Sequence, residues 1–416
     1  NLLYFTTPTP GAANGSGFLG FVEEPLVSVE RGFFGSTFSV EITTPTANAE
    51  IYFTTDGSAP SPSNGALYNA PVSVTTTTTL RAMASRDGFL SSSISTHSYL
   101  FLADVLAEDG AGLPLPPFPS TSTWDYEMDP AVVTDIRFST LEEDLQSLPA
   151  LSLVMDVEDA WGTTGFYATL QDGRAGERPV SVELIGTDGV GLFQEDAGVR
   201  IMGSGSVRRA IGKKSLRLVF RSEFGPKKLE YPFFGPDYAD EIDTIAIRGN
   251  YFDTWTFQSD SGPLGGACCG RSRSMYLRDQ FAHESHAAMG AHAIAGNWVH
   301  LYMNGIYWGI YNPTERPDEE FMQSYFGASD ADYDVIKTGV DLVAGDLVGW
   351  NEMLTIARGN GPNGSLEGDA AYEDLKQYLD IDQFIDYMLV NFYGGNHDWP
   401  HNNWYVTRNR TATPGF

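Results

Sequence analysis

The sequence predicts a multidomain protein in which an all-β, immunoglobulin-like sandwich precedes an α+β domain. Its 416 residues are too many for one ordinary compact core and enough for two or three. Short alternating strands separated by turns fill residues 21–102, whereas helical and strand patterns alternate after residue 130. Hydrophobic residues make up 42% of the chain, so both regions have enough apolar side chains to form cores.

The N-terminal part divides into a linker and a β-rich domain. Residues 1–20 have the composition of a linker, or of the end of a preceding domain. Within the predicted domain, residues 21–102, the pairs Asp56-Gly57 and Asp87-Gly88 mark tight turns between strands. The predicted strands include residues 38–42, 50–54, 72–74 and 79–84. Regularly spaced short strands of this kind favour a β-sandwich.

A change of composition marks the second domain. Residues 103–130 contain a proline-rich run, Leu113 to Pro119, and are predicted to be a linker. Residues 131–416 are predicted to form the α+β domain, because helical and strand patterns are mixed along them. Helical patterns fall at residues 276–290, 317–327, 346–358 and 370–393, with strands at 213–220, 243–248, 298–304 and 306–311 among them.

The charge balance limits the classes of partner. The chain has 54 acidic residues against 25 Lys and Arg residues, a formal net charge of −29. Such a surface repels nucleic acid and anionic membranes and favours a basic partner, although solubility alone also accounts for it. No apolar stretch is long enough to span a membrane. The two cysteines, Cys268 and Cys269, are neighbours that reach disulfide geometry only with strain, so they do not indicate a compartment.

A motif near the end of the chain carries candidate chemistry. His397-Asp398 is followed by Asn403, between an apolar helical run and the strand-like run Trp404 to Val406. An aspartate with an asparagine five residues later has the spacing of a protein-kinase catalytic loop. In such a loop the aspartate accepts or orients the substrate hydroxyl proton, and the asparagine holds Mg²⁺. Asp and Asn are also ordinary loop residues, so this motif depends on support from elsewhere in the chain.

A glycine-containing turn followed by lysines gives that support. Gly203 and Gly205 precede the strand-like run from Lys213 to Phe220, and a strand lysine behind a glycine-rich turn is how kinases hold ATP phosphates. Alternation along a strand puts Lys213 and Lys214 on opposite faces, so at most one points into a pocket, and Lys214 is slightly favoured. Arg200 is a further candidate for phosphate binding. Paired lysines on a solvated face are the simpler interpretation.

A predicted hairpin leads to two acidic residues. Residues 299–311 form two alternating runs around Asn304-Gly305, the strongest short hairpin signal. Glu315 and Asp318 follow at the predicted start of a helix. Helix capping would explain both residues. The functional interpretation makes them a lysine partner or an aid to metal binding.

The N-terminal β-rich domain, residues 21–102, resembles a known accessory module. Residues 51–60, with the run Tyr52 to Pro60, resemble the Tyr-x-Thr-x-Asp-Gly-Ser-x-Pro signature of the chitobiase/β-hexosaminidase C-terminal-type sandwich. Tyr68 and the threonine-rich run 75–79 fit the same module. The resemblance implies an accessory to a neighbouring domain, and Asp56-Gly57 is sufficiently explained as a tight turn.

The second half resembles the CotH kinase family, named for a bacterial spore-coat protein. The resemblance covers residues 195–408 and rests on several motifs in order: 198–203, Lys213 to Ser215, Arg248, 277–280, the hairpin with Glu315, and His397 to Asn403. It implies an atypical protein-kinase-like fold that uses ATP with Mg²⁺ or Mn²⁺ to phosphorylate serines of a partner protein. We expect that substrate to be serine-rich and basic.

The resemblance also assigns roles to residues. It makes Asp398 the catalytic-loop residue and a metal ligand with Asn403, and Glu315 the acidic partner. A strand lysine, Lys214 or Lys213, would bind phosphate beside Gly203, Gly205 and Arg200. The family pattern requires a second metal-binding aspartate after the catalytic loop, which we expect beyond Phe416. The domain is therefore expected to be incomplete and its activity impaired in this chain, with both ends continuing into a longer protein.

Three alternatives remain open from the sequence. The kinase-like domain could be an inactive scaffold of a secreted or cell-surface binding protein. The combination of these two domains leads us to expect the protein outside a bacterial cell. A zinc hydrolase would use His283 and His286 with Glu284, but the histidines have the wrong spacing for that motif. A carbohydrate-active enzyme would need two catalytic carboxylates, and the sequence shows no convincing pair.

Overall fold

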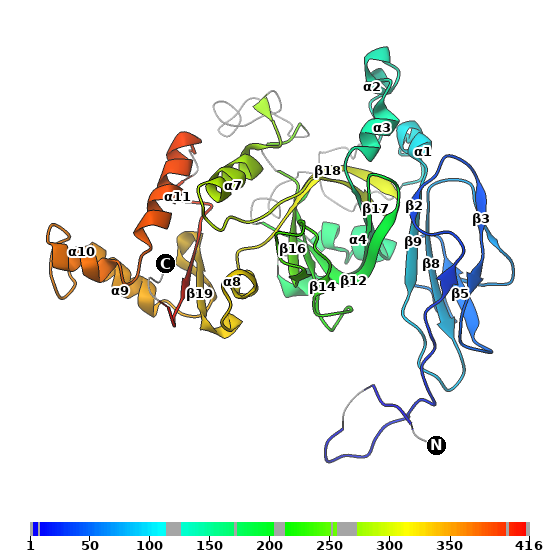
Figure 1. Ribbon diagram of the computed structural model, residues 1–416. Coiled ribbons are helices and arrows are strands. Elements are labelled where there is room, and N and C mark those ends of the chain that lie inside the picture. Colours follow the sequence, from blue (N-terminus) through cyan, green and yellow to red (C-terminus); the bar gives the residue numbers. More distant parts are fainter. Residues whose placement is uncertain are drawn as a thin grey trace. The chain divides into compact units, whose positions relative to one another are not determined.

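The computed structural model describes residues 3–6, 9–113, 126–169, 173–203, 213–250, 253–255, 273–396 and 399–412. The chain forms two compact units, which we describe separately. The first unit contains residues 1–227 and 298–312, and the second contains residues 228–297 and 313–416. The first unit is rich in strands and the second mixes helices and strands (Figure 1).

The N-terminal β region of the first unit runs from β1 to β9. Its strands are β1 (Leu26–Val27), β2 (Gly32–Phe33), β3 (Phe38–Val40), β4 (Ile42–Thr43), β5 (Glu50–Thr54), β6 (Ala66–Leu67), β7 (Val72–Val74), β8 (Thr78–Ser85) and β9 (Ser95–Leu100). One sheet has the order β2-β9-β8-β5-β6, and β1 with β4 and β3 with β7 form two-stranded sheets. Residues of all these sheets share one hydrophobic core, which includes Val40, Leu80 and Tyr99.

Strand β9 differs from the usual pattern of one buried and one solvated face. All six of its residues are buried, including Thr96, His97 and Ser98. Tyr99 packs into the core of the N-terminal β region, and Leu100 belongs to a second core with Ala150, Ile185 and Tyr302. The strand is therefore covered on both faces, so its polar side chains need partners inside the protein.

The rest of the first unit is built on a second, longer sheet. Six of its strands follow the order β18-β17-β10-β11-β12-β13. They are β10 (Ala150–Val154), β11 (Arg178–Ile185), β12 (Gly191–Ile201), β13 (Leu216–Val219), β17 (Val299–Met303) and β18 (Ile306–Thr314), the last of which continues into the second unit. Neighbouring strands are antiparallel except β10 and β17, which are parallel.

Short helices complete this unit. They are α1 (Leu102–Ala107), α2 (Pro130–Val133), α3 (Leu141–Gln146), α4 (Val157–Trp161) and α5 (Phe166–Thr169), with 3-10 turns at Ile136–Phe138 and Arg174–Gly176. Helix α1 falls in the predicted linker, yet its Leu102 and Val105 are buried against Leu145 and Tyr302. The chain is thus folded onto the second sheet immediately after β9.

The second unit combines short sheets with longer helices. Its strands are β14 (Leu229–Glu230), β15 (Glu241–Ile242), β16 (Thr244–Arg248), β19 (Tyr333–Lys337), β20 (Asp341–Ala344) and β21 (Tyr405–Asn409). Its helices are α7 (Arg278–Ala288), α8 (Glu319–Phe326), α9 (Val348–Ala357), α10 (Asp369–Leu375) and α11 (Ile381–Tyr393), with 3-10 turns at Asp330–Asp332 and Thr338–Val340. Strands β20, β19 and β21 form one sheet, and Ile336 of β19 packs with Met353 and Leu375 of the helices.

Several sequence predictions are confirmed. The chain is multidomain, with an N-terminal β-rich region followed by a region of mixed α and β content. The predicted hairpin is present as β17 and β18, and Asn304 and Gly305 between them have φ values of 49° and 79°, as a tight hairpin turn requires. Among the described residues, the helices are too short or too polar to cross a membrane.

Two predictions about elements are wrong in detail. The helical pattern at 370–393 is two helices, because residues 376–380 leave the helix and Asp380 begins a new one as its N-cap. The strand predicted from Lys213 begins only at Leu216, so both lysines lie before it. Alternation along a strand therefore does not decide which way the two lysines point. The domain boundaries at residues 21, 102 and 131 stay predictions.

Candidate functional site

The lysine pair lies at the end of the ladder between β12 and β13. The Met202 N–H donates to the Ser215 carbonyl oxygen at 2.9 Å, which continues the ladder one step beyond the strands. Gly203 and Lys214 are therefore the residues immediately beyond this last backbone pair. Its φ is 88°, in the left-handed region that favours glycine. Gly205, predicted in the same turn, lies outside the described residues.

Lys213 has a distinctive environment. Its Nζ donates to the Ile310 carbonyl oxygen at 2.5 Å and lies 4.7 Å from the centre of the Tyr311 ring. Burial lowers the pKa of Lys213 to about 7. Gly309, with a φ of 99°, adjoins the site, and a Cβ on it would lie 3.8 Å from this Nζ. A partly desolvated ammonium beside a strand glycine fits an anionic phosphate, which would offset the cost of burying the charge.

Lys214 is the more deeply buried residue of the pair. It is 1% exposed, whereas Lys213 is half-buried. Burial lowers the pKa of Lys214 to about 8. Both lysines therefore lose hydration in the folded protein, and a change of ligand charge nearby would shift the protonation of either one.

Arg200 on β12 already has an acidic partner. Its Nε lies 3.3 Å from Oε1 of Glu177, and both side chains are buried. Arg221 binds the other oxygen of the same carboxylate at 2.6 Å. Two guanidinium groups thus share one carboxylate.

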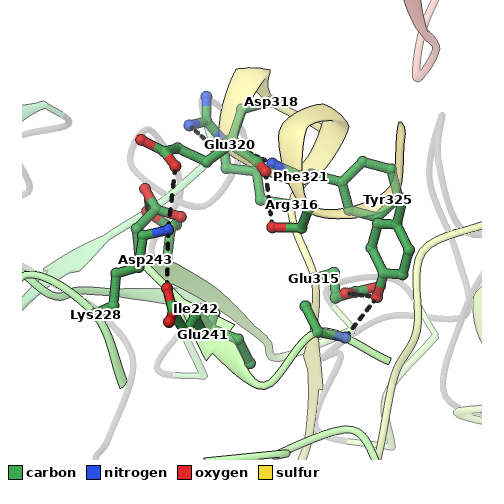
Figure 2. Close-up of a pocket in the computed structure, with 13 residues that line it drawn as sticks. Lys228, Glu241, Ile242, Asp243, Glu315, Arg316, Asp318, Glu320, Phe321 and Tyr325 are labelled. Atoms are coloured by element: carbon green, nitrogen blue, oxygen red, sulfur yellow. Dashed lines mark hydrogen bonds and ion pairs between the residues drawn. The ribbon is translucent and has the colours of Figure 1, made fainter. Parts of the chain in front are cut away.

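Glu315 lies in the second unit, at a small surface pocket (Figure 2). One carboxylate oxygen accepts from the Ala295 N–H at 2.7 Å, and the other accepts a short hydrogen bond from the Tyr325 hydroxyl. Burial raises the pKa of Glu315. Both oxygens are thus held by neutral donors of this unit.

Asp318 lies at the same pocket and starts helix α8. Its Oδ1 accepts from the Phe321 N–H at 3.2 Å, so the capping interpretation of this residue is confirmed. Its Oδ2 pairs with Arg316 at 3.0 Å. Burial, with the nearby charge of Asp243, raises the pKa of Asp318 to about 7 despite Arg316. The pocket is also lined by Glu241 and Glu320. The Lys228 Nζ lies 3.4 Å from Oε2 of Glu241 and 3.7 Å from Oε2 of Glu320.

The predicted catalytic loop is only partly described. His397 and Asp398 lie outside the described residues. Asn403 is exposed, with a φ of 57°, just before β21. In the described part of the chain, no three His, Cys, Asp or Glu side chains converge to hold a metal ion, and this includes His283, which lies 3.5 Å from Asp279. The metal roles of Asp398 and Asn403 are therefore untested by the geometry.

Two groups of contacts at these sites could not be predicted from the sequence. Gly309 and the Ile310 carbonyl oxygen bring the hairpin to Lys213, across 97 residues of sequence, and no local pattern reports such a contact. Asp243 and Lys228 join Glu315 at the pocket because β14 and β15 pair. The hairpin signal was the one available clue, since it predicted that residues 306–311 form a strand able to present backbone carbonyls.

Two family matches accompany this geometry. Residues 199–414, which are more than half of the chain, match the family described as CotH kinase protein. Residues 40–99 match the family described as Fn3 associated. A search of the curated proteins finds no match. The first match contains the lysine pair, the hairpin, the acidic pocket and the predicted catalytic loop.

Proposed function

Because this chain belongs to the CotH kinase protein family, we propose that it is an ATP-dependent protein kinase that transfers a phosphoryl group to serine. The observation that carries the proposal is the desolvated ammonium of Lys213, held by the Ile310 carbonyl oxygen beside Gly309. Phosphoryl transfer depends mainly on positioning and charge stabilisation, which such a lysine supplies. When bound, ATP with Mg²⁺ or Mn²⁺ supplies the phosphoryl group.

The chain's own residues then have separate tasks. Lys213 binds phosphate oxygens in this proposal, and Lys214, Gly203, Gly205 and Arg200 are the further candidates for the same role. Asp398 orients the serine hydroxyl and accepts its proton, and Asn403 with Asp398 holds the metal. Glu315, in the second unit, keeps the role of acidic partner that the family resemblance implies. Support for these roles comes from the family membership and from the spacing of the loop residues.

The proposal extends to fold and location. We infer that the N-terminal β region is an immunoglobulin-like sandwich and the region of the CotH match a kinase-like fold. Shared packing of three small sheets around one core supports the first. We also infer that the protein acts outside the cytoplasm on a serine-rich, basic substrate protein, which the net charge of −29 would attract.

Nucleotide binding and transfer test the proposal on the full-length protein. ATP affinity with Mg²⁺ or Mn²⁺ is measured by calorimetry, and transfer of the γ-phosphate to a serine-rich basic peptide by radiolabel. Asp398→Ala should abolish transfer and should also weaken binding of ATP with the metal, because Asp398 is a proposed metal ligand. Lys213→Met should weaken binding at least about tenfold, the usual scale for one charge-assisted contact.

Matched lysine variants sharpen the assignment. Lys376→Met removes an exposed lysine at the end of α10 that is paired with Glu373 of the same helix, and it should change nothing. Loss of binding in Lys214→Met but not in Lys213→Met would move the phosphate role to Lys214. Absence of both binding and transfer in the full-length protein would refute the kinase and leave the second candidate, an inactive scaffold of a surface protein.

A further inference from the structure

The N-terminal β region contacts the second sheet of the first unit through a buried polar cluster. Glu183 of β11 is fully buried, and its Oε1 lies 2.9 Å from Nε of Arg31. The same oxygen accepts from the Ser98 N–H at 3.0 Å, and Oε2 accepts from the Ser98 hydroxyl at 2.5 Å. Ser98 also contacts the Ser152 hydroxyl of β10 at 2.7 Å. A buried carboxylate with this many partners is costly to separate from them.

A second contact joins the region to the turn of the β17–β18 hairpin. Gly57, in the turn predicted from Asp56-Gly57, has a φ of 86°. A Cβ at this glycine would lie 2.6 Å from Nδ2 of Asn304 and 2.7 Å from the Met155 carbonyl oxygen. Asn304 in turn bonds Met155 in both directions, each at 2.8 Å. The two turns therefore meet with no room for a side chain between them.

The neighbouring residues extend this contact. A Cβ on Gly305 would lie 2.9 Å from the Thr77 methyl group. The Thr77 N–H donates to Asp104 of α1 at 2.7 Å, and α1 buries Leu102 and Val105 against Tyr302 of β17. Three separate groups of contacts thus hold the hairpin from the side of the N-terminal β region.

We propose that the N-terminal β region is a positioning element for Lys213, acting through the β17–β18 hairpin, with Gly57 and Glu183 as positioning residues. The hairpin turn that the region holds and the Ile310 carbonyl oxygen that binds Lys213 belong to one two-stranded element. Fixing the turn fixes the register in which that carbonyl meets Nζ. The effect on nucleotide binding rests on the proposed function, whereas the effect on the hairpin does not.

Gly57→Ala and Gly88→Ala form a matched pair of variants in the full chain. Both glycines have a positive φ, 86° and 77°, so both substitutions carry the same kind of backbone strain. Only at Gly57 does the new methyl group collide with Asn304 and Met155, because the nearest atom at Gly88 is a Leu19 methyl carbon at 3.2 Å. Any difference between the variants reports the contact between the two turns.

Hydrogen–deuterium exchange followed by mass spectrometry is the deciding measurement. Gly57→Ala should speed amide exchange across residues 299–311 by about tenfold or more relative to Gly88→Ala. The rate of acetylation of Lys213 at neutral pH is followed in the same samples. It should change in Gly57→Ala and stay the same in Gly88→Ala. Equal exchange and equal labelling in the two variants would overturn the proposal, whatever the protein does with nucleotide.

A second experiment tests the docking itself. A protease site inserted between Ala111 and Gly112, both exposed, allows the folded chain to be cut after α1. The two pieces should elute together on gel filtration, and Glu183→Gln should release the N-terminal piece. Glu223→Gln is the matched control, because Glu223 pairs with Arg174 at 2.9 Å but is exposed. Separation of the pieces in the unsubstituted protein would contradict a permanent positioning role.

Nucleotide affinity separates this proposal from the kinase proposal. If the full-length protein binds ATP, Gly57→Ala should weaken binding by about tenfold relative to Gly88→Ala. If no variant binds ATP while the exchange difference is present, the kinase proposal fails and the positioning of the hairpin stands. If binding is intact and equal in both variants, control of Lys213 by the N-terminal β region is refuted.

Discussion

Lys213 should make the stability of the protein depend on pH in the alkaline range. Its folded pKa, lowered to about 7 by burial, lies below its ordinary value of 10.5. Below pH 7 both states are protonated and the full cost of desolvation is present. Between pH 7 and 10.5 the folded state has lost the proton, so the free energy of unfolding rises with pH.

Lys213→Met tests this dependence. The variant should be more stable than the parent at pH 6–7, by on the order of 1 kcal/mol or more, and the gain should vanish near pH 10. Urea titrations at a series of pH values measure it, with Lys376→Met as the exposed control. A constant difference across that range would show that Lys213 does not titrate in it.

Asp318 should produce the opposite slope in the acidic range. Its pKa, raised from 3.8 to about 7 by burial and Asp243, means that the folded state holds a proton which the unfolded state has lost. The free energy of unfolding therefore falls as pH rises from about 4 to 7. Asp318→Asn keeps a capping side chain and should remove most of that fall.

Thermal unfolding across pH 4–8 measures the effect, with Asp380→Asn as the control. Asp380 caps α11 by accepting from the Gln383 N–H at 3.0 Å, so the same substitution is made at a second cap. The Tm of Asp318→Asn relative to the parent should increase with pH, and the curve of Asp380→Asn shows what the same substitution does at another helix cap. Parallel curves for the two variants would exclude titration of Asp318 in this range.

At the scale of the element, α11 depends on its N-cap. Asp380 starts the helix that leads to the predicted catalytic loop, and the preceding residues 376–380 are not helical. Asp380→Ala should lower the free energy of unfolding by about 1 kcal/mol, because an N–H at the helix start loses its acceptor. Asp386→Ala, within the same helix, is the control. Far-ultraviolet circular dichroism with denaturant checks the loss.

The elements show what sequence patterns can and cannot predict. The β17–β18 hairpin was predictable because Asn304-Gly305 fixes the turn locally. The start of β13 was not, because the chain alternates from Lys213 onward although the ladder pairs only from Leu216. The break before α11 was hidden because apolar residues such as Leu379 and Ile381 continue the helical pattern through it. Local sequence patterns predict local geometry such as a turn. Where a strand or helix begins and ends depends also on contacts with residues far away in the sequence.

The same limit applies to the site. Lysines after a glycine-containing turn can be recognised in the sequence, and the family resemblance strengthens the prediction that they bind phosphate. The carbonyl oxygen of Ile310 cannot be recognised, since every residue has one and only the folded sheet selects it. The polar residues of β9 gave no signal of a second sheet either, because burial on both faces is usually predicted from apolar runs.

At the scale of the whole molecule, the acidic surface should act oppositely on the two proposed substrates. A net charge of −29 attracts a basic peptide and repels free nucleotide, and both effects are long-range. Salt screens them, since the Debye length falls from about 30 Å at 0.01 M to about 8 Å at 0.15 M. Raising the salt should therefore slow association of the peptide and speed association of nucleotide.

Stopped-flow measurements of both association rates at rising ionic strength test this prediction. A peptide in which serines alternate with glycine instead of lysine is the neutral control, and its association rate should barely change. Because charge steering alters association rates by about tenfold or more, opposite trends for the two substrates should be measurable. A basic peptide whose rate does not depend on salt would show that local contacts, not the overall charge, select the partner. The acidic composition would then reflect solubility alone.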